Sequence, residues 1–165
     1  MIRARSSLRH RLAAAGVVAL AGLALAGCSA TNEITTAKAY SASDGVRAEL
    51  GDITAENLIV LTSAEGAPAA LQGAFTNRGT SPITVSLTDG TAAIGTVRVD
   101  PATTVLVGGD TGKRITFTAS SAPGGVAPMT LATGSGGSLT VSVPVLDGTL
   151  PEYATLVPTP TTTAS

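Results

Sequence analysis

Between residues 44 and 150 the chain alternates between apolar and polar positions. The alternation is clearest in ITVSLTD from Ile83 and in SLTVSVPV from Ser138, where aliphatic residues alternate with Ser or Thr. Successive side chains of a strand point to opposite faces of a sheet, so this period of two predicts strands that bury one face. No helical period is sustained after residue 27, and the pattern therefore predicts an all-β domain.

Turn-forming residues, mainly Asp-Gly pairs and Gly-rich stretches, divide this region into short segments. Nine of these are predicted strands: 46–50, 58–63, 71–77, 83–89, 93–100, 103–108, 113–119, 129–133 and 138–145. Short strands at this spacing are typical of a sandwich. The stretch LQGAFTNRGTSPITVSLTDG also resembles the immunoglobulin-like domains of bacterial surface proteins. We therefore expect an immunoglobulin-like β-sandwich over residues 44–156, with Phe75 and Phe117 in its core.

The first 27 residues have a different pattern, typical of an export signal. Four arginines and no acidic residue are followed by an apolar or small-residue stretch, Leu12 to Ala26, of 15 residues. A helix needs about 20 residues to cross a bilayer, so this stretch is too short for a permanent span. A basic start, a short apolar middle and small residues at the end predict a cleaved signal peptide over residues 1–27.

The sequence Leu25-Ala26-Gly27-Cys28 resembles the bacterial lipobox. The resemblance implies that the Cys28 thiol carries a diacylglyceryl group and that cleavage occurs just before it. Two acyl chains hold a protein stably at a bilayer, whereas one holds it weakly. We therefore expect a lipid anchor at Cys28 on the outer face of the cytoplasmic membrane. A flexible tether would span 28–43, and a disordered Pro/Thr-rich tail would span 157–165.

Charge and composition exclude several functions for the chain that remains after cleavage. Residues 28–165 hold six basic residues against eleven acidic ones, a formal charge of about −5. Nucleic-acid binding needs a basic surface, so we expect no nucleic-acid partner. With the chain's single cysteine lipidated, no disulfide can form, and the domain must rely on its core.

The residues that could carry chemistry are few. The only histidine, His10, is lost with the signal, so nucleophilic catalysis would need a Ser-Lys pair built on Lys38 or Lys113. Met129 is the only remaining soft metal ligand. Calcium binding and glycoside hydrolysis both need carboxylates. The candidates each have a simpler explanation in a turn or on the surface: Asp44, Asp89, Asp147, Glu49, Asp52 and Glu56. We therefore expect no catalytic residue, no cofactor and no metal site.

The two ends of the domain carry a more specific resemblance. YSASDGVRAELGDI from Tyr40 and VPVLDGTLPEY from Val143, with the lipobox ahead, resemble a family of small, uncharacterised actinobacterial lipoproteins, and more distantly the LpqE-like lipoproteins. Some relatives are labelled DNA modification methylase, but the chain lacks the motif and the alternating strands and helices of such an enzyme. The LpqE-like proteins have been grouped with copper chaperones whose sites use Met and His, which the lone Met129 does not reproduce.

These observations predict a non-catalytic binding or envelope-associated module. The alternative is an accessory lipoprotein that presents a metal or a small ligand to a membrane transporter or oxidase. The segment 146–157 leaves two interpretations open. In the first interpretation, Leu150 and Tyr153 fold back over one end of the sandwich, and Leu150→Ala lowers the free energy of unfolding by about 2–5 kcal/mol. In the other interpretation, Leu150, Pro151 and Tyr153 form an exposed docking peptide for an envelope protein.

Replacing Cys28 with Ala tests the anchor. The variant has no thiol to lipidate, so we expect it in the medium, or as an uncleaved precursor, and not as processed protein in the detergent-extractable membrane fraction. Cell fractionation with immunoblotting measures this. Processed Cys28→Ala protein that still needs detergent for extraction would contradict the prediction.

Overall fold

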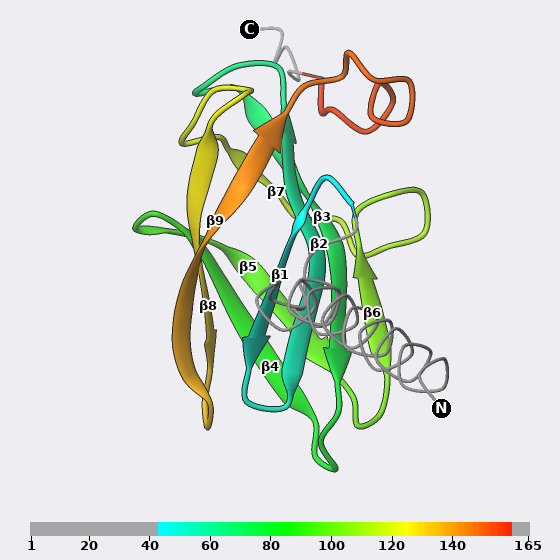
Figure 1. Cartoon of the computed structure of the whole chain (residues 1–165), viewed down its shortest axis with the longest axis vertical. Helices are drawn as coiled ribbons and strands as arrows, with labels where there is room; N and C mark the ends of the chain where they lie inside the picture. Colours follow the sequence, from blue (N-terminus) through cyan, green and yellow to red (C-terminus); the bar gives the residue numbers. More distant parts are fainter. Residues whose placement is uncertain (1–42, 160–165) are drawn as a thin grey trace, which may run out of the picture. The chain divides into compact units, whose positions relative to one another are not determined.

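The computed structural model describes residues 43–159, which form strands and turns without an α-helix (Figure 1). The predicted signal peptide, Cys28, nearly all of the tether and the end of the tail lie outside the described residues. Within residues 43–159, no helix is long and apolar enough to cross a membrane. Nine strands are present in this range: β1 (Val46–Leu50), β2 (Ile53–Thr62), β3 (Pro68–Asn77), β4 (Ile83–Asp89), β5 (Ala92–Val99), β6 (Thr104–Val107), β7 (Thr116–Thr118), β8 (Val126–Thr133) and β9 (Gly137–Leu146).

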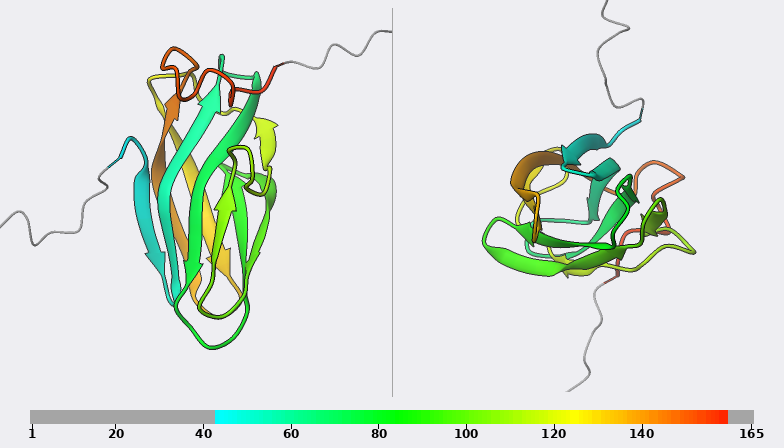
Figure 2. Two further views of the ribbon diagram at one scale, coloured as in Figure 1. Left: turned by 90° about the vertical axis from the view of Figure 1, so that its right-hand side faces the viewer. Right: turned by 90° about the horizontal axis from the view of Figure 1, so that it is seen from below.

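The strands form two layers of a sandwich that join along one side (Figure 2). One layer has the order β5-β4-β8-β9, and the other contains β2 and β3, with β1 pairing β2 and both β6 and β7 pairing β3. A short parallel ladder, Val60↔Val145 and Leu61↔Leu146, connects β2 to β9. A four-stranded layer packed on a second antiparallel layer is the arrangement of immunoglobulin-like sandwiches. The predicted all-β fold class is confirmed.

All nine predicted strands are present, although several are longer than the pattern indicated. β2 begins at Ile53 and not at residue 58, because residues 53–55 pair with both β1 and β3. The sequence obscures this start because the alternation breaks at Asn57. There the ladder between β2 and β3 shifts register and Asn57 adopts a φ of 52°. An extra residue of this kind is a β-bulge, which bends the strand.

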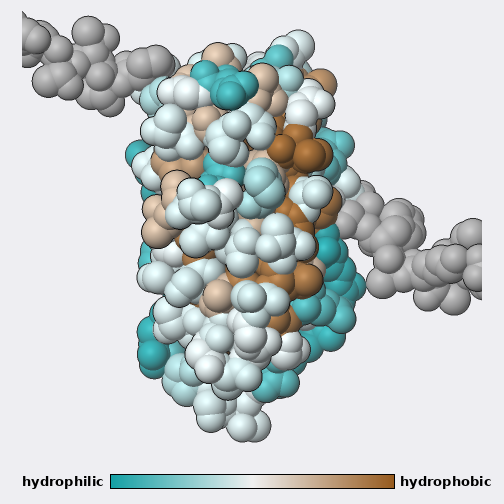
Figure 3. Space-filling model, turned by 90° about the vertical axis from the view of Figure 1, so that its left-hand side faces the viewer, coloured by the Kyte–Doolittle hydropathy of each residue, from teal (hydrophilic) through white to brown (hydrophobic). Residues whose placement is uncertain are grey.

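Aliphatic side chains fill the space between the two layers, together with one aromatic ring. Phe75 is fully buried, and Val85 and Leu87 point inward from β4 as their alternation predicts. Phe117 is only partly buried against this core. On the outer face of the β5-β4-β8-β9 layer, hydroxyl side chains pair across strands, as Thr130 and Thr140 do at 2.7 Å. Much of that side of the molecule is pale in Figure 3, although a band of brown, hydrophobic side chains runs down its right-hand part.

The bulge at Asn57 requires a glycine on the neighbouring strand. Gly73 has a φ of 148°, which side-chain-bearing residues rarely adopt, and a Cβ there would lie 2.9 Å from the backbone oxygen of Glu56. The Asn57 side chain also anchors the start of the domain, since its Oδ1 accepts hydrogen bonds from the Ser43 hydroxyl at 2.6 Å and the Gly45 N–H at 3.1 Å. One irregularity in β2 thus positions two other parts of the chain.

Gly73→Ala is expected to destabilise the domain by about 1–3 kcal/mol, because the new Cβ meets the backbone of Glu56 and the φ becomes strained. Urea denaturation measures the free energy of unfolding. Gly134→Ala is the matched control, since a Cβ at Gly134 meets nothing within 4 Å. Equal stability of the two variants would show that the bulge tolerates a side chain.

Candidate functional site

Strand β2 buries both of its faces. Leu58 and Val60 belong to the core cluster between the layers. Ile59 and Leu61 alternate with them and so point away from that core, yet they are only 1% and 0% exposed. Ala70 on the neighbouring strand β3 is also buried outside the core cluster. The outer face of β2 and β3 is therefore covered.

Residues 147–159, which we call the C-terminal segment, lie over this face: Tyr153 and Leu156 line one cavity with Ile59, and Leu156 and Val157 line another with Ala70. The segment leaves the end of β9 and turns back on itself, with N–H groups of Tyr153 and Ala154 bonded to the carbonyl of Leu150 at 3.0 and 3.1 Å. Leu156 and Val157 are half-buried. The packed chain therefore continues past residue 156, where the tail was predicted to begin.

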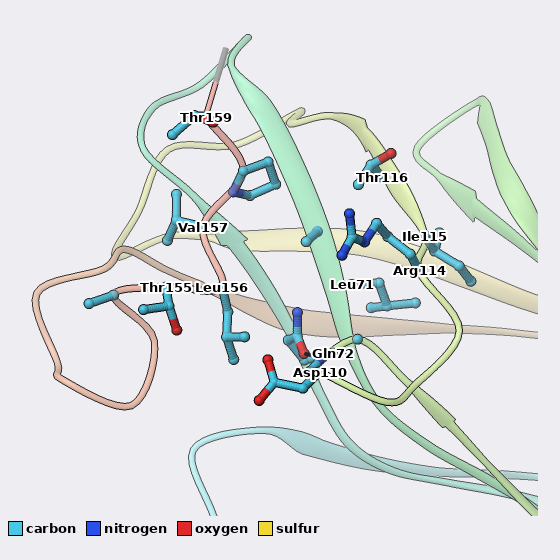
Figure 4. Close-up of a pocket in the computed structure, with 15 residues that line it drawn as sticks. Leu71, Gln72, Asp110, Arg114, Ile115, Thr116, Thr155, Leu156, Val157 and Thr159 are labelled. Atoms are coloured by element: carbon cyan, nitrogen blue, oxygen red, sulfur yellow. Dashed lines mark hydrogen bonds between the residues drawn. The ribbon is translucent and has the colours of Figure 1, made fainter. Parts of the chain in front are cut away.

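A cavity of about 500 Å³ lies between the C-terminal segment and the outer face of β3. Thr155, Leu156, Val157 and Thr159 form one side, and Arg114, Ile115 and Thr116 form the other (Figure 4). The base includes Ala70, Gln72, Gly108, Gly109 and Asp110. Pockets of 300–1,000 Å³ with an apolar lining and a few polar groups are the usual sites for small ligands.

A second cavity, of about 440 Å³, lies on the other side of Leu156. It is lined by Ile59 and Ala74 from the outer face of the sheet and by Leu106, which is 54% exposed. Both cavities share Gln72 and Leu156. The Leu156 side chain therefore stands between two hollows of one groove, which we call the outer groove.

The loop between β6 and β7 forms one rim of the outer groove, and Gln72 holds it in place. Gln72 Oε1 accepts a hydrogen bond from the Gly109 N–H at 2.7 Å. A Cβ on Gly108, whose φ is 78°, would overlap the Gln72 amide, so the close approach depends on glycine. The Gly-rich stretch 108–112, expected to be a simple turn, thus positions one wall of the site.

A single hydrogen bond joins the C-terminal segment to the rest of the described chain. The Tyr153 hydroxyl donates to Asp44 Oδ2 at 2.7 Å. This bond raises the pKa of Tyr153 to about 12, because Asp44 favours the protonated phenol; burial and the charges of Asp44 and Glu152 add to the shift. The half-buried side chains of Leu156 and Val157 add apolar contact, which is not directional.

The structure bears on the first interpretation of residues 146–157, in which the segment folds back over the sandwich. Tyr153 folds back and is half-buried, as the first interpretation requires. Leu150 does not: it is 45% exposed, so its predicted role as a cover is wrong, and Leu156 lines the groove in its place. Pro151 is exposed beside Leu150. The role of Leu150, Pro151 and Tyr153 as partner contacts stays a prediction.

The three aspartates of the Asp-Gly turns do not converge on one ion position. Asp44 accepts from Tyr153, and Asp147 Oδ1 accepts from the Thr149 N–H at 2.9 Å, a bond that lowers the pKa of Asp147. Asp89 is only 3% exposed and accepts from the Ser120 hydroxyl at 2.6 Å. It ties the β4–β5 hairpin to the loop after β7, a structural role that the turn alone did not predict.

The remaining candidates for chemistry also have structural roles. Arg47 Nη2 lies 2.5 Å from Glu49 and its Nη1 lies 4.0 Å from Glu56, so both acids belong to one ion-pair cluster on β1 and β2. Lys113 bridges to β6 through its backbone. Met129 is fully buried in the core, where it cannot reach a ligand at the surface. Within residues 43–159, no group of three His, Cys, Asp or Glu could hold a metal ion.

Comparison with known proteins gives structural neighbours only. No family model matches the chain. No curated protein matches it. Among solved structures, it is similar to the copper-bound PCuAC domain from PmoF2, with a TM-score of 0.48 and 20% identity over 61% of this chain and 97% of that one. The apo PCuAC domain from PmoF1 has a TM-score of 0.49 and 16% identity over 60% of this chain and 97% of that one. The apo PmoF2 PCuAC domain has a TM-score of 0.48 and 17% identity over 63% of this chain and 97% of that one.

Leu150→Ala is expected to change the free energy of unfolding by less than about 0.5 kcal/mol, because the side chain is largely exposed. Leu156→Ala removes a half-buried side chain from the outer groove and is expected to cost about 1–2 kcal/mol. Urea denaturation of the two variants measures the difference. A larger loss for Leu150→Ala would restore the first interpretation of this residue.

Tyr153→Phe is expected to cost about 0.5–1.5 kcal/mol at neutral pH through loss of the bond to Asp44. Because the pKa is raised on folding, this contribution is complete below the ordinary pKa of 10.0 and is lost as pH rises through about 12. Denaturation midpoints of the wild type and the variant should therefore converge over that range. A difference that persists above it would show that the phenolic proton is not involved.

Proposed function

We propose that this protein is a membrane-anchored, extracytoplasmic binding module that holds a small ligand in the outer groove and is not an enzyme. The cavity of about 500 Å³ between the C-terminal segment and β3 is the observation that carries the proposal. It combines aliphatic walls with a guanidinium, a carboxylate and an amide, the mixture typical of ligand sites. The lipobox resemblance at Cys28 supports the anchor.

The chain's residues favour a small organic ligand over a metal. Within the described range, the only methionine is buried in the core and no cluster of His, Cys, Asp or Glu has the composition of a metal site. Soft metals such as copper need sulfur or imidazole ligands. The ligand-presenting alternative is therefore retained for a small molecule, with a transporter or another envelope protein as the recipient.

The groove also favours binding over catalysis. Its titratable groups are Arg114, Asp110, Glu56 and Tyr153, and they line different parts of the two cavities. A general acid or base needs a pKa near the working pH, whereas the shift at Tyr153 moves its pKa away from neutrality. These groups are suited to fixing the position of a ligand.

A cavity-filling variant tests the proposal. Thr116 lies on β7 beside Ala70 and lines the larger cavity, so Thr116→Trp should fill it. The full-length chain in detergent is mixed with the low-molecular-weight fraction of the envelope of the cells that produce it, and the melting temperature is measured by calorimetry. We expect a rise of about 4 °C or more for the wild type and none for Thr116→Trp.

Thr118→Trp is the matched control. Thr118 lies on the same face of β7, pairs with Pro68 and does not line the larger cavity, so its variant should respond like the wild type. If no fraction stabilises the wild type, or if all three proteins are stabilised equally, the outer groove is not the binding site.

A further inference from the structure

Two opposite charges line the larger cavity without neutralising each other. Arg114 and Asp110 both contribute to its wall, and among residues 43–159 no nitrogen of Arg114 lies within 4.0 Å of a carboxylate. Figure 4 shows them on different sides of the cavity, with the Arg114 guanidinium reaching toward the C-terminal segment. A cation and an anion that line one cavity and form no ion pair with another described residue match a ligand that carries both charges.

We propose that the larger cavity binds a short zwitterionic peptide, of about two residues, whose carboxylate pairs with Arg114 and whose ammonium pairs with Asp110. This inference rests on the proposed function and names the class of its ligand. Arg is well suited to the carboxylate, because its planar guanidinium can donate two parallel hydrogen bonds.

The amide of Gln72 provides the third polar contact. Its Oε1 already accepts from Gly109, which fixes the orientation of the side chain. Its NH₂ group donates to no other described residue and lies at the base of the same cavity. An amide N–H at this position can donate to the peptide carbonyl between the two charged ends.

The aliphatic part of the cavity selects the side chain. Leu156 and Val157 on the C-terminal segment and Ala70 on β3 supply apolar side chains to the cavity, whereas the Ile115 side chain belongs to the core. A branched side chain such as that of leucine would remove these surfaces from water, which favours an apolar residue beside the ligand's carboxylate. The same contact would hold the C-terminal segment, which is otherwise joined to the domain by one hydrogen bond.

Alanyl-leucine and two of its derivatives test the inference by calorimetric titration of the full-length chain. Alanyl-leucinamide lacks the carboxylate, and N-acetyl-alanyl-leucine lacks the ammonium. We expect saturable binding of alanyl-leucine and a loss of about tenfold in affinity for each derivative. Arg114→Gln should abolish the difference between the acid and its amide, and Asp110→Asn should abolish the difference caused by acetylation.

Arg98→Gln and Asp100→Asn are the matched controls, since Arg98 and Asp100 pair with each other at 3.3 Å on the surface, away from the outer groove. Both should retain the preferences of the wild type. The inference is overturned if the three peptides bind equally, or if alanyl-leucine shows no saturable binding up to about 10 mM, roughly tenfold above a millimolar Kd. If envelope fractions still stabilise the wild type in that case, the proposed function stands and only the ligand class is wrong.

Discussion

The structure depends on the burial of both faces of β2. Leu58 and Val60 belong to the core between the two layers, while Ile59 and Leu61 point outward and are equally inaccessible. Two large aliphatic side chains on an outer face would be costly if left in water. The sandwich therefore needs a cover on this side, and the C-terminal segment supplies it.

That cover is incomplete, which is why the outer groove exists. The C-terminal segment reaches the sheet through Leu156 and Val157 but forms no ladder with β3, and Tyr153 makes its only hydrogen bond to the rest of the described chain. Cavities remain on both sides of Leu156. A cover held by apolar contact and one hydrogen bond can shift more easily than a paired strand, which is a useful property in the wall of a binding site.

The irregular parts of the sheet are the parts that build the groove. The bulge at Asn57 requires Gly73 and anchors Ser43 and Gly45, next to the Asp44 that holds Tyr153. On the opposite rim, Gln72 fixes the Gly-rich loop that separates β6 from β7. The regular strands provide a rigid frame, and these few departures from alternation shape its outer surface.

The sequence by itself determined the all-β class and all nine strands, because alternation of period two depends only on which face of a strand is buried. It also contained a signal that was missed. The unbroken apolar run Leu58 to Leu61 indicates a strand buried on both faces. Only the tertiary structure decided what covers that strand. The local sequence pattern does not tell whether Leu150 or Leu156 is buried. The path of the C-terminal segment leaves Leu150 exposed and places Leu156 in the outer groove. Likewise, Asp110 and Arg114 lie close together in the sequence between β6 and β7, but Gln72 lies on β3, and only the fold brings it to the same cavity.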